Sequence, residues 1–232
     1  MNPFQRALAP PILCLCGALN GGGSEWFRPF DGASLDGWEV RPEERASDWS
    51  VVDEVLVGSG SGEESYLMFA EALSDFELAF DYRIVGSVGN TGVEIRGAPV
   101  EGKPSRLWGY HADIGQVGSG PKVLGAWDFH EGDRGDYLAR RGESVTIGPD
   151  GQKHVLPLSD ALRPEDLHAD GWNSVLIHAE GFHLWFTING KMASEIRDNQ
   201  VEKRRASGVI GFQLHSGDRT RVQFRRIRLR RL

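Results

Sequence analysis

A two-residue alternation of large apolar side chains runs through the stretch Phe76–Ile84, which reads FELAFDYRI. The even positions are all large and apolar, whereas the odd positions are mostly charged or small. Successive side chains of a β-strand point to opposite faces of its sheet. The pattern therefore predicts a strand that packs one face against a core and leaves the other face open.

Turn signals separate other short apolar runs. The dipeptides Asp53-Glu54, Glu180-Gly181 and Asn189-Gly190 each lie between two such runs. Asn189-Gly190 is the strongest hairpin signal, because both of its residues tolerate positive φ. The chain has 30 glycines and 11 prolines but only 3 methionines, which favours many turns and short elements over long helices.

These patterns predict an all-β fold, an antiparallel two-sheet β-sandwich with its core between the sheets. The buried residues of this core are expected to include Phe76, Phe80, Ile95, Ile114, Phe212 and Leu214. Residues 131–170 break the pattern, because they are polar and rich in charge, glycine and proline. We interpret them as a long polar excursion with a turn at residues 149–151, equally well a functional loop or a variable surface insertion.

Residues 1–24 have the features of a signal peptide and linker. Arg6 supplies a positive start, Ala7–Leu19 form an apolar run, and residues 21–24 form a glycine-rich linker. The run is too short for a spanning helix, so we expect no integral membrane span. We predict export to a periplasmic or extracellular location, with one domain over residues 25–232, and the alternative is a disordered cytoplasmic N-terminus. Cys14 and Cys16 lie too close together for a structural disulfide framework.

The charge balance argues against nucleic acid as a partner, because the net charge is −7. Residues 219–231 do contain seven arginines among thirteen residues. Alternation with apolar residues places most of them on the outward face of a final strand, where we expect them to solvate a sheet edge. A register break at Arg225-Arg226 indicates a β-bulge.

Polar side chains alternate with the core positions of three predicted strands. The side chains expected to share one face are Glu94, Arg96, His111, Asp113, Gln213 and His215. Such a face carries more functional groups than contact with solvent requires. A single pair such as Glu94 and Arg96 is by itself better explained as a surface ion pair, so the clustering carries the hypothesis of a site.

Seven short motifs occur in a fixed order along residues 26–232. They are FDGASLDGW (30–38), WSVV (49–52), NTGVEIR (90–96), GYHADI (109–114), GWN (171–173), ING (188–190) and GVIGFQLHSG (208–217). In this order the chain resembles the 3-keto-disaccharide (3-keto-glucoside) hydrolase domain family, which implies a concanavalin A-like jelly roll. The chain departs from the family pattern at Asp53-Glu54, at Gly125-Ala126-Trp127-Asp128 and at His111, where relatives often carry Glu or Gln.

The resemblance implies an enzyme that cleaves glycosides already oxidised at C3 of the sugar. A C3 ketone acidifies the C2 proton, so a base can remove it, the glycosidic oxygen can leave from C1, and water can then add. The proton carriers implied by facing direction and resemblance are His111, Asp113, Asp128 and His215. The implied substrate-binding residues are Asn90, Glu94, Arg96, Trp108 and Gln213, with Trp108 stacking on a sugar ring. The expected partner is therefore an oxidised saccharide or glycoside.

Other functions stay open at the level of sequence. No cofactor and no metal ligands are assigned, although His111, Asp113 and His215 leave a divalent cation open in the absence of a compact ligand motif. Glu94 and Asp113 would suit a conventional carboxylate-pair glycosidase if their separation fits. The main rival is a non-catalytic carbohydrate-binding module, because concanavalin A-like sandwiches include lectins as well as enzymes. Two histidines and several carboxylates on the expected face favour an enzyme.

Overall fold

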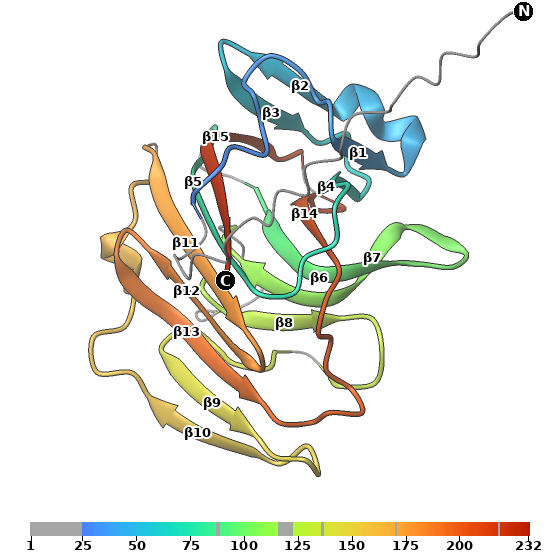
Figure 1. Cartoon of the computed structure of the whole chain (residues 1–232). Helices are drawn as coiled ribbons and strands as arrows, with labels where there is room; N and C mark the ends of the chain where they lie inside the picture. The colour runs from blue at the N-terminus through green and yellow to red at the C-terminus, as the bar shows by residue number, and fades with distance from the viewer. Residues whose placement is uncertain (1–24, 87–88, 116–122, 136, 170, 218) are drawn as a thin grey trace, which may run out of the picture.

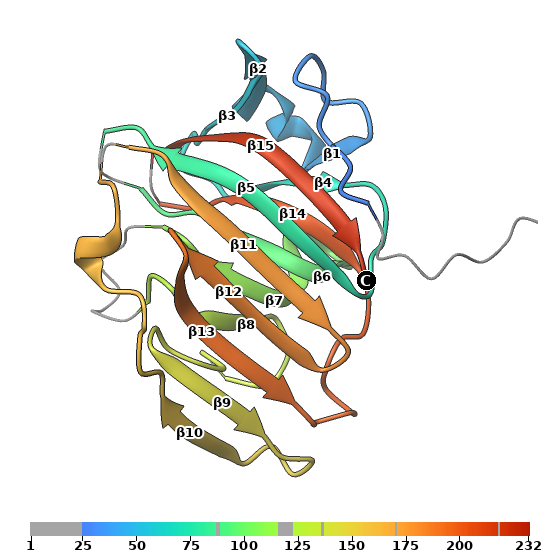
Figure 2. The ribbon, with the colours of Figure 1, turned by 60° about the vertical axis from the view of Figure 1, so that its left-hand side comes forward.

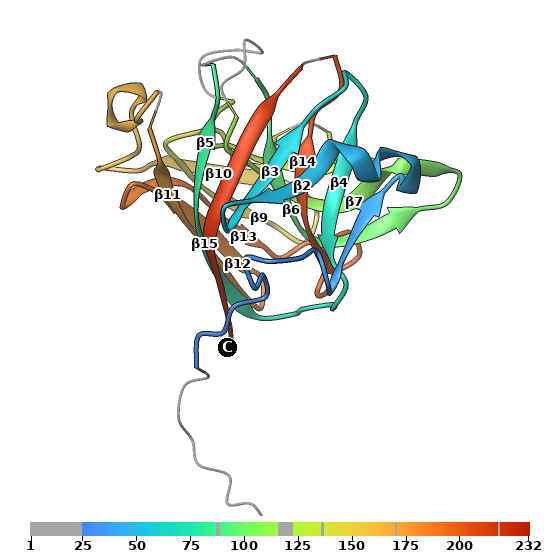
Figure 3. The same ribbon diagram turned by 90° about the horizontal axis from the view of Figure 1, so that it is seen from above.

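Two β-sheets face each other in the structure (Figure 1), a computed structural model. It describes residues 25–86, 89–115, 123–135, 137–169, 171–217 and 219–232, so the expected signal peptide and linker lie outside the described residues. Figure 3, viewed from above, shows β14 and β6 of one layer beside β15 and β5 of the other. The expected all-β two-sheet sandwich is confirmed.

One sheet has six strands. In spatial order they are β1 (Trp38–Arg41), β4 (Ser65–Phe69), β14 (Val209–Leu214), β6 (Gly92–Val100), β7 (Lys103–Asp113) and β8 (Trp127–His130). All neighbouring pairs in this sheet are antiparallel. Its inner face contributes to the core, and its outer face carries the polar side chains discussed below.

The other sheet has nine strands. In spatial order they are β10 (Lys153–Pro157), β9 (Glu143–Ile147), β13 (Lys191–Asp198), β12 (His183–Ile188), β11 (Asn173–Glu180), β5 (Phe76–Ile84), β15 (Arg221–Arg231), β3 (Val55–Ser59) and β2 (Trp49–Val52). The pairing of β13 with β9 is parallel, so the sheet is mixed and the expectation of a purely antiparallel sandwich is corrected. Short 3₁₀ helices lie at Glu43–Asp48 and Pro164–Asp166. Within the described residues no helix is long and apolar enough to cross a membrane.

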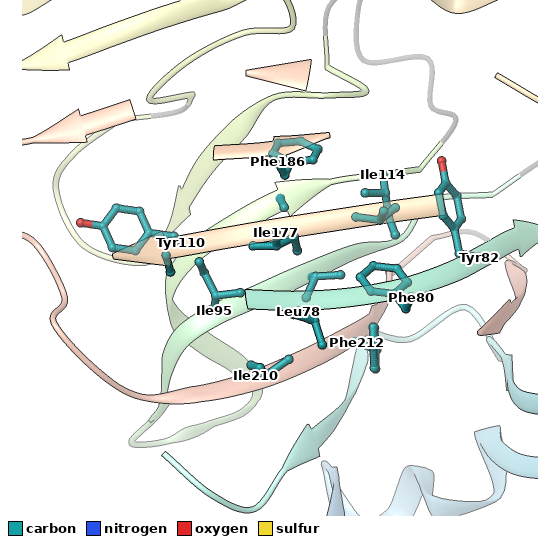
Figure 4. Packing of buried hydrophobic residues seen from close by; sticks show 14 of the residues in the cluster. Leu78, Phe80, Tyr82, Ile95, Tyr110, Ile114, Ile177, Phe186, Ile210 and Phe212 are labelled. Carbon is teal, nitrogen blue, oxygen red and sulfur yellow. The ribbon is translucent and has the colours of Figure 1, made fainter. Parts of the chain in front are cut away.

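The core lies between the sheets, as the alternation predicts. All six residues expected to be buried are at most 2% exposed. Figure 4 shows Leu78 and Phe80 of β5 packed near Phe212 of the opposite sheet. The ring centroid of Phe212 lies 5.3 Å from that of Phe80 and 4.3 Å from that of Phe224, so this one side chain joins β14 to β5 and β15.

The predicted turns form where the sequence places them. Asp53 and Glu54 join β2 to β3 with φ angles of 51° and 61°, and Asn189 and Gly190 join β12 to β13 with 51° and 76°. Both residues of each pair therefore adopt the left-handed backbone of a type I′ hairpin turn. The predicted bulge is also confirmed, because the β15–β5 register shifts between Arg225 and Arg228.

The C-terminal arginines lie on a strand that has a partner strand on both sides for only part of its length. Strand β15 lies between β5 and β3 (Figure 2), but β3 pairs with Arg221–Phe224, so the expected sheet edge is corrected for that part alone. Carboxylates of the neighbouring strand β5 compensate two of the later arginines: Arg225 Nε lies 3.1 Å from Asp81 Oδ2, and Arg230 pairs with Glu77. Opposite charges on adjacent strands stabilise their pairing.

The polar excursion is partly a continuation of the sandwich. Residues 131–170 contain β9 and β10, which extend the nine-stranded sheet and are joined by the predicted turn, where Gly148 N donates to Gln152 O at 2.8 Å. The interpretation of the whole segment as an excursion is therefore corrected. Only the stretch that connects β8 to β9 and the stretch after β10 depart from the sheets.

We expect Phe212→Ala to lower the free energy of unfolding by about 3–5 kcal/mol, because it removes a fully buried ring and leaves a cavity between the sheets. Val52→Ala is the control, since this side chain is 52% exposed and should change stability by no more than about 0.5 kcal/mol. Urea unfolding followed by tryptophan fluorescence measures both. Equal stabilities of the two variants would contradict this account of the core.

Candidate functional site

The outer face of the six-stranded sheet holds a strongly polar pocket. Its lining residues are Glu64, Asn90, Arg106, His111, Asp113, Val123, Asp128, His130, Tyr137, Gln213 and His215. Three carboxylates and three imidazoles thus meet one guanidinium and two amides. Titratable groups concentrated in a pocket are typical of a site that moves protons or binds polar ligands.

Strand register aligns polar side chains of β6, β7 and β8. Glu94 of β6 pairs with His111 of β7, and His111 pairs with Asp128 of β8. The three side chains therefore form a row across the sheet on the face opposite the core. Their apolar neighbours in sequence, including Val93, Ala112 and Phe129, point into the core.

The row is built around the carboxylate of Glu94, which is 0% exposed. Glu94 Oε2 lies 3.1 Å from Nδ1 of His111 and 3.2 Å from Nδ1 of His130. The two imidazoles stack on each other, with centroids 4.1 Å apart and planes at 25°. Each Nδ1–H donates to the same oxygen, so one buried carboxylate orients both rings.

Glu94, His111 and His130 are also the residues that could hold a metal ion, since one ligand atom of each lies within 4.8 Å of the others. Both Nδ1 atoms already lie at hydrogen-bond distance from Glu94 Oε2, and we describe the cluster as a hydrogen-bonded group.

The surroundings of His130 favour its charged form. Burial alone lowers the pKa of the imidazole, but the charge and hydrogen bond of Glu94, with the charge of Asp128, raise the pKa of His130 to about 9. Its Nε2 lies 3.6 Å from Asp128 Oδ2. At neutral pH, His130 is therefore an imidazolium between two carboxylates.

The surroundings of Asp113 favour its neutral form. Burial raises the pKa of this carboxyl to about 6, and the charge of Asp128 acts in the same direction, whereas His111, His130 and His215 oppose the rise. A carboxyl with a pKa close to neutrality can both accept and return a proton. Asp113 therefore has the property required of an acid–base residue.

Backbone donors fix the carboxylate of Asp128. Its Oδ1 accepts the N–H of Phe129 at 2.7 Å and the N–H of Tyr137 at 3.0 Å. Oδ2 is thereby turned towards His130. Asp128 thus lies within the polar cluster, at the position that the sequence interpretation gave it.

A second group of hydrogen bonds forms the opposite wall of the pocket. Gln213 Nε2 donates to Glu64 Oε1 at 2.8 Å and to the hydroxyl of Tyr66 at 3.0 Å. Arg106 lies 2.9 Å from Glu64 Oε2. Burial, reinforced by the charges of Glu94 and Glu64, raises the pKa of Tyr66 well above its usual value, so the hydroxyl stays neutral.

The structure brings most of the predicted site residues together. The lining includes His111, Asp113, Asp128, His215, Asn90 and Gln213, and Glu94 lies directly beneath His111 and His130. The shared face predicted for Glu94, His111, Asp113, Gln213 and His215 is confirmed, while the roles of all these residues stay predictions. Nδ1 of His215 lies 2.6 Å from the carbonyl oxygen of Ser216.

Arg96 does not belong to the pocket. It sits at a β-bulge with φ of 50°, and its guanidinium donates to Ser74 O at 2.8 Å, Gly181 O at 2.7 Å and Asp75 Oδ1 at 3.0 Å. Its side chain is thus used to join the loops at one end of the sandwich. The expectation that Arg96 shares the face of Glu94 is wrong.

Trp108 also lies apart from the pocket. It is three residues before His111 on β7, so the alternation directs it to the opposite face. It is 41% exposed, and the guanidinium of Arg205 lies 4.7 Å from the centre of its ring. The expected stacking of Trp108 on a sugar in this pocket does not agree with this placement.

Five lining residues were missed by the sequence interpretation: Glu64, Arg106, Val123, His130 and Tyr137. His130 had a usable signal, because it lies two residues after Asp128 and shares its face in a strand with buried Trp127 and Phe129. Tyr137 lies in the connection after β8 and adopts φ of 51°, which no periodicity indicates.

Comparison with known proteins agrees with this fold. Residues 25–230 match the 3-keto-alpha-glucoside-1,2-lyase-like domain, and the chain belongs to that family. A search of the curated proteins found no match. The family match and the similar solved structures are therefore the comparisons that bear on this chain.

Among solved structures, the chain is similar to a candidate glycosyl hydrolase from Parabacteroides distasonis ATCC 8503, with 16% identity, a TM-score of 0.58, and 89% of this chain and 94% of that chain covered. It is also similar to a galectin-like protein of unknown function from Bacillus subtilis, with 12% identity, a TM-score of 0.60, and 91% and 96% covered. The carbohydrate-binding module CBM66 from Bacillus subtilis has 13% identity, a TM-score of 0.50, and 82% and 93% covered. At these identities the similarities show the fold, which both enzymes and binding modules use.

We expect Gly92→Ala to displace His111. A Cβ at Gly92 would lie 2.0 Å from Nε2 and 2.3 Å from Cε1 of the His111 ring, so the ring lies where only a glycine leaves room. The variant should fold with a loss of about 1–3 kcal/mol in unfolding free energy and with shifted His111 ring resonances. Histidine-selective NMR and urea unfolding measure both effects. Unchanged His111 resonances would contradict this placement of the ring.

Proposed function

We propose that this chain cleaves 3-keto-glycosides by proton abstraction at C2, elimination of the aglycone and addition of water. Family membership supports this carbohydrate chemistry. The observation that carries the proposal is Asp113, a carboxyl in the pocket with a pKa raised to about 6 and three imidazoles around it. Asp113 and the imidazolium of His130 together offer a base and a cationic proton donor in one pocket at neutral pH.

The elimination requires a base, a stabilised enolate and an acid. The base takes the C2 proton, and the C–H electron pair forms a C2–C3 double bond while the ketone oxygen becomes an enolate. The enolate oxygen then reforms the C3 carbonyl, and the electron pair of the C2–C3 double bond forms a C1–C2 double bond. The C1–O bond breaks, and its electrons go to the aglycone oxygen. The aglycone oxygen takes a proton from the acid. Preorganised donors near the C3 oxygen lower the barrier of the first step.

The residues of the pocket suit these three tasks. Asp113 is proposed as the base, because its carboxylate and neutral forms are both accessible near neutrality. His130 is proposed as the acid, because it is protonated at neutral pH and 21% exposed. His111, whose Nδ1–H is held by Glu94, directs its other edge over Gly92 and is proposed to contact the reacting part of the sugar.

Hydration reverses the proton movements of the elimination. C1 of the unsaturated ketone is electrophilic, because it is conjugated with the C3 carbonyl, so water adds there and gives a proton to His130, which is neutral after the elimination. Asp113, neutral after the elimination, exchanges its proton with solvent and then protonates C2, and the resulting sugar is the same product as in hydrolysis. One residue thus serves as base in the first half of the reaction and as acid in the second.

We expect cleavage of 3-keto-glycosides but not of the unoxidised parents, because only the ketone makes the C2 proton removable by a carboxylate. In D₂O the sugar product should carry deuterium at C2, measured by mass spectrometry against a no-enzyme control. Asp113→Asn should reduce the rate about 10²–10⁴-fold. Asp160→Asn is the matched control, because this exposed aspartate pairs with Lys191 on the surface.

Direct displacement at C1 would leave C2 unlabelled, and that result would contradict the elimination. Binding of the sugar without turnover of any oxidised glycoside would instead favour a non-catalytic carbohydrate-binding module.

We expect a bell-shaped pH profile of kcat/KM. The acid limb should lie near pH 6, because Asp113 acts as a base only when deprotonated and its pKa is about 6. The alkaline limb should lie near pH 9, because His130 acts as an acid only when protonated and its pKa is about 9. Asp113→Asn should remove the acid limb, and His130→Gln should remove the alkaline limb. A wild-type profile that is flat between pH 5 and pH 10 would exclude these assignments.

A further inference from the structure

A buried ion pair lies behind the pocket, on the core side of the six-stranded sheet. Arg134 follows β8, Asp198 ends β13, and their side chains are 3% and 0% exposed. The guanidinium is bidentate, with NH1 2.5 Å from Asp198 Oδ2 and NH2 2.9 Å from Oδ1. Neither residue has a role in the proposed reaction, and neither lines the pocket.

The carboxylate of Asp198 is fully hydrogen-bonded. Besides Arg134, it accepts the hydroxyl of Tyr110 at 2.5 Å and the backbone N–H of Gln200 at 3.1 Å. Burying two charges costs several kcal/mol, which a complete set of partners only offsets. The pair is therefore a weak source of stability, and its strict geometry selects one arrangement of the segments that it joins.

These segments carry the polar cluster on their other face. Tyr110 directly precedes His111 on β7, and Phe129 lies between Asp128 and His130 on β8. The ring of Phe129 packs edge-on against Tyr110 at 5.0 Å, and the guanidinium of Arg134 lies 4.8 Å from its centre. The ion pair thus contacts the reverse side of both strands that hold the cluster.

The same segment reaches around to the pocket itself. Three residues after Arg134, the N–H of Tyr137 donates to Asp128 Oδ1, and the next N–H, of Leu138, donates to Trp127 O at 2.7 Å. One short segment is therefore attached at two residues: Arg134 pairs with Asp198, and Tyr137 contacts Asp128.

We infer that Arg134 and Asp198 are positioning residues that hold the Tyr137 N–H on Asp128 and thereby orient the carboxylate towards His130. The inference deepens the proposed function and rests on it, because Asp128 and His130 lie in the proposed site. Arg134 does not contact the substrate pocket, and its effect passes through Phe129 and the Tyr137 backbone.

The test compares Arg134→Met with Lys203→Met. Lys203 pairs with Asp133 at 2.7 Å and joins the same two segments, but the two side chains are 36% and 79% exposed. Hydrogen exchange of the Tyr137 amide reports the contact with Asp128 without any substrate, and the Phe80 amide at the centre of the nine-stranded sheet reports global unfolding. Steady-state kinetics on a 3-keto-glycoside gives kcat and KM.

For Arg134→Met we expect both amides to exchange faster, because Asp198 is left buried without its partner, but the Tyr137 amide at least about tenfold more than the Phe80 amide, and kcat to fall about 10–100-fold with little change in KM. Lys203→Met should leave the exchange rate of the Tyr137 amide and kcat at the wild-type level. Arg134→Lys, which keeps one charged contact with Asp198, should restore part of the protection and part of kcat.

If Arg134→Met does not fold, Arg134→Lys decides: a folded variant with wild-type protection of Tyr137 overturns the inference. Equal losses in Arg134→Met and Lys203→Met also overturn it, because the exposed pair would then hold the segment equally well. If wild-type protein turns over no 3-keto-glycoside, the proposed function fails, whereas the exchange data still decide whether Arg134 positions Asp128.

Discussion

The fully buried carboxylate of Glu94 is the constraint on which the outer face of the six-stranded sheet depends. A carboxylate removed from water is stable only with charged or strongly hydrogen-bonding partners, and Glu94 has the Nδ1 atoms of His111 and His130. These contacts stack the two imidazoles, raise the pKa of His130 and direct its far edge to Asp128. The glycine at position 92 then follows, because the oriented His111 ring occupies the space of a side chain there.

Much of this arrangement could be predicted from a period of two residues. Alternation with buried neighbours placed Glu94, His111, Asp113, Gln213 and His215 on one face, and β-strand geometry allows no other result in regular strands. It failed at Arg96, where a bulge with positive φ turns the side chain to the end of the sandwich. The same alternation would have excluded Trp108 from this face, because Trp108 lies an odd number of residues from His111 on β7.

The remainder could not be predicted because it depends on contacts between distant segments. Strand β9 pairs in parallel with β13, and neither segment alone indicates that partner. The same applies to Tyr137, whose place beside Asp128 is set by the Arg134–Asp198 pair across 64 residues of sequence. The segment between β8 and β9 is polar because it joins the nine-stranded sheet to the pocket, and polarity was the only property visible in its sequence.

The fold by itself does not distinguish an enzyme from a sugar-binding module, since neighbours of both kinds share it at low sequence identity. The proposal of an enzyme rests on two ionisable groups in one small pocket. Burial raises the pKa of Asp113 to about 6, while Glu94 raises the pKa of His130 to about 9, although both lie beside Asp128. The proposed reaction requires a base whose pKa lies below neutral pH, for proton abstraction at C2, and an acid whose pKa lies above it, for protonation of the leaving oxygen.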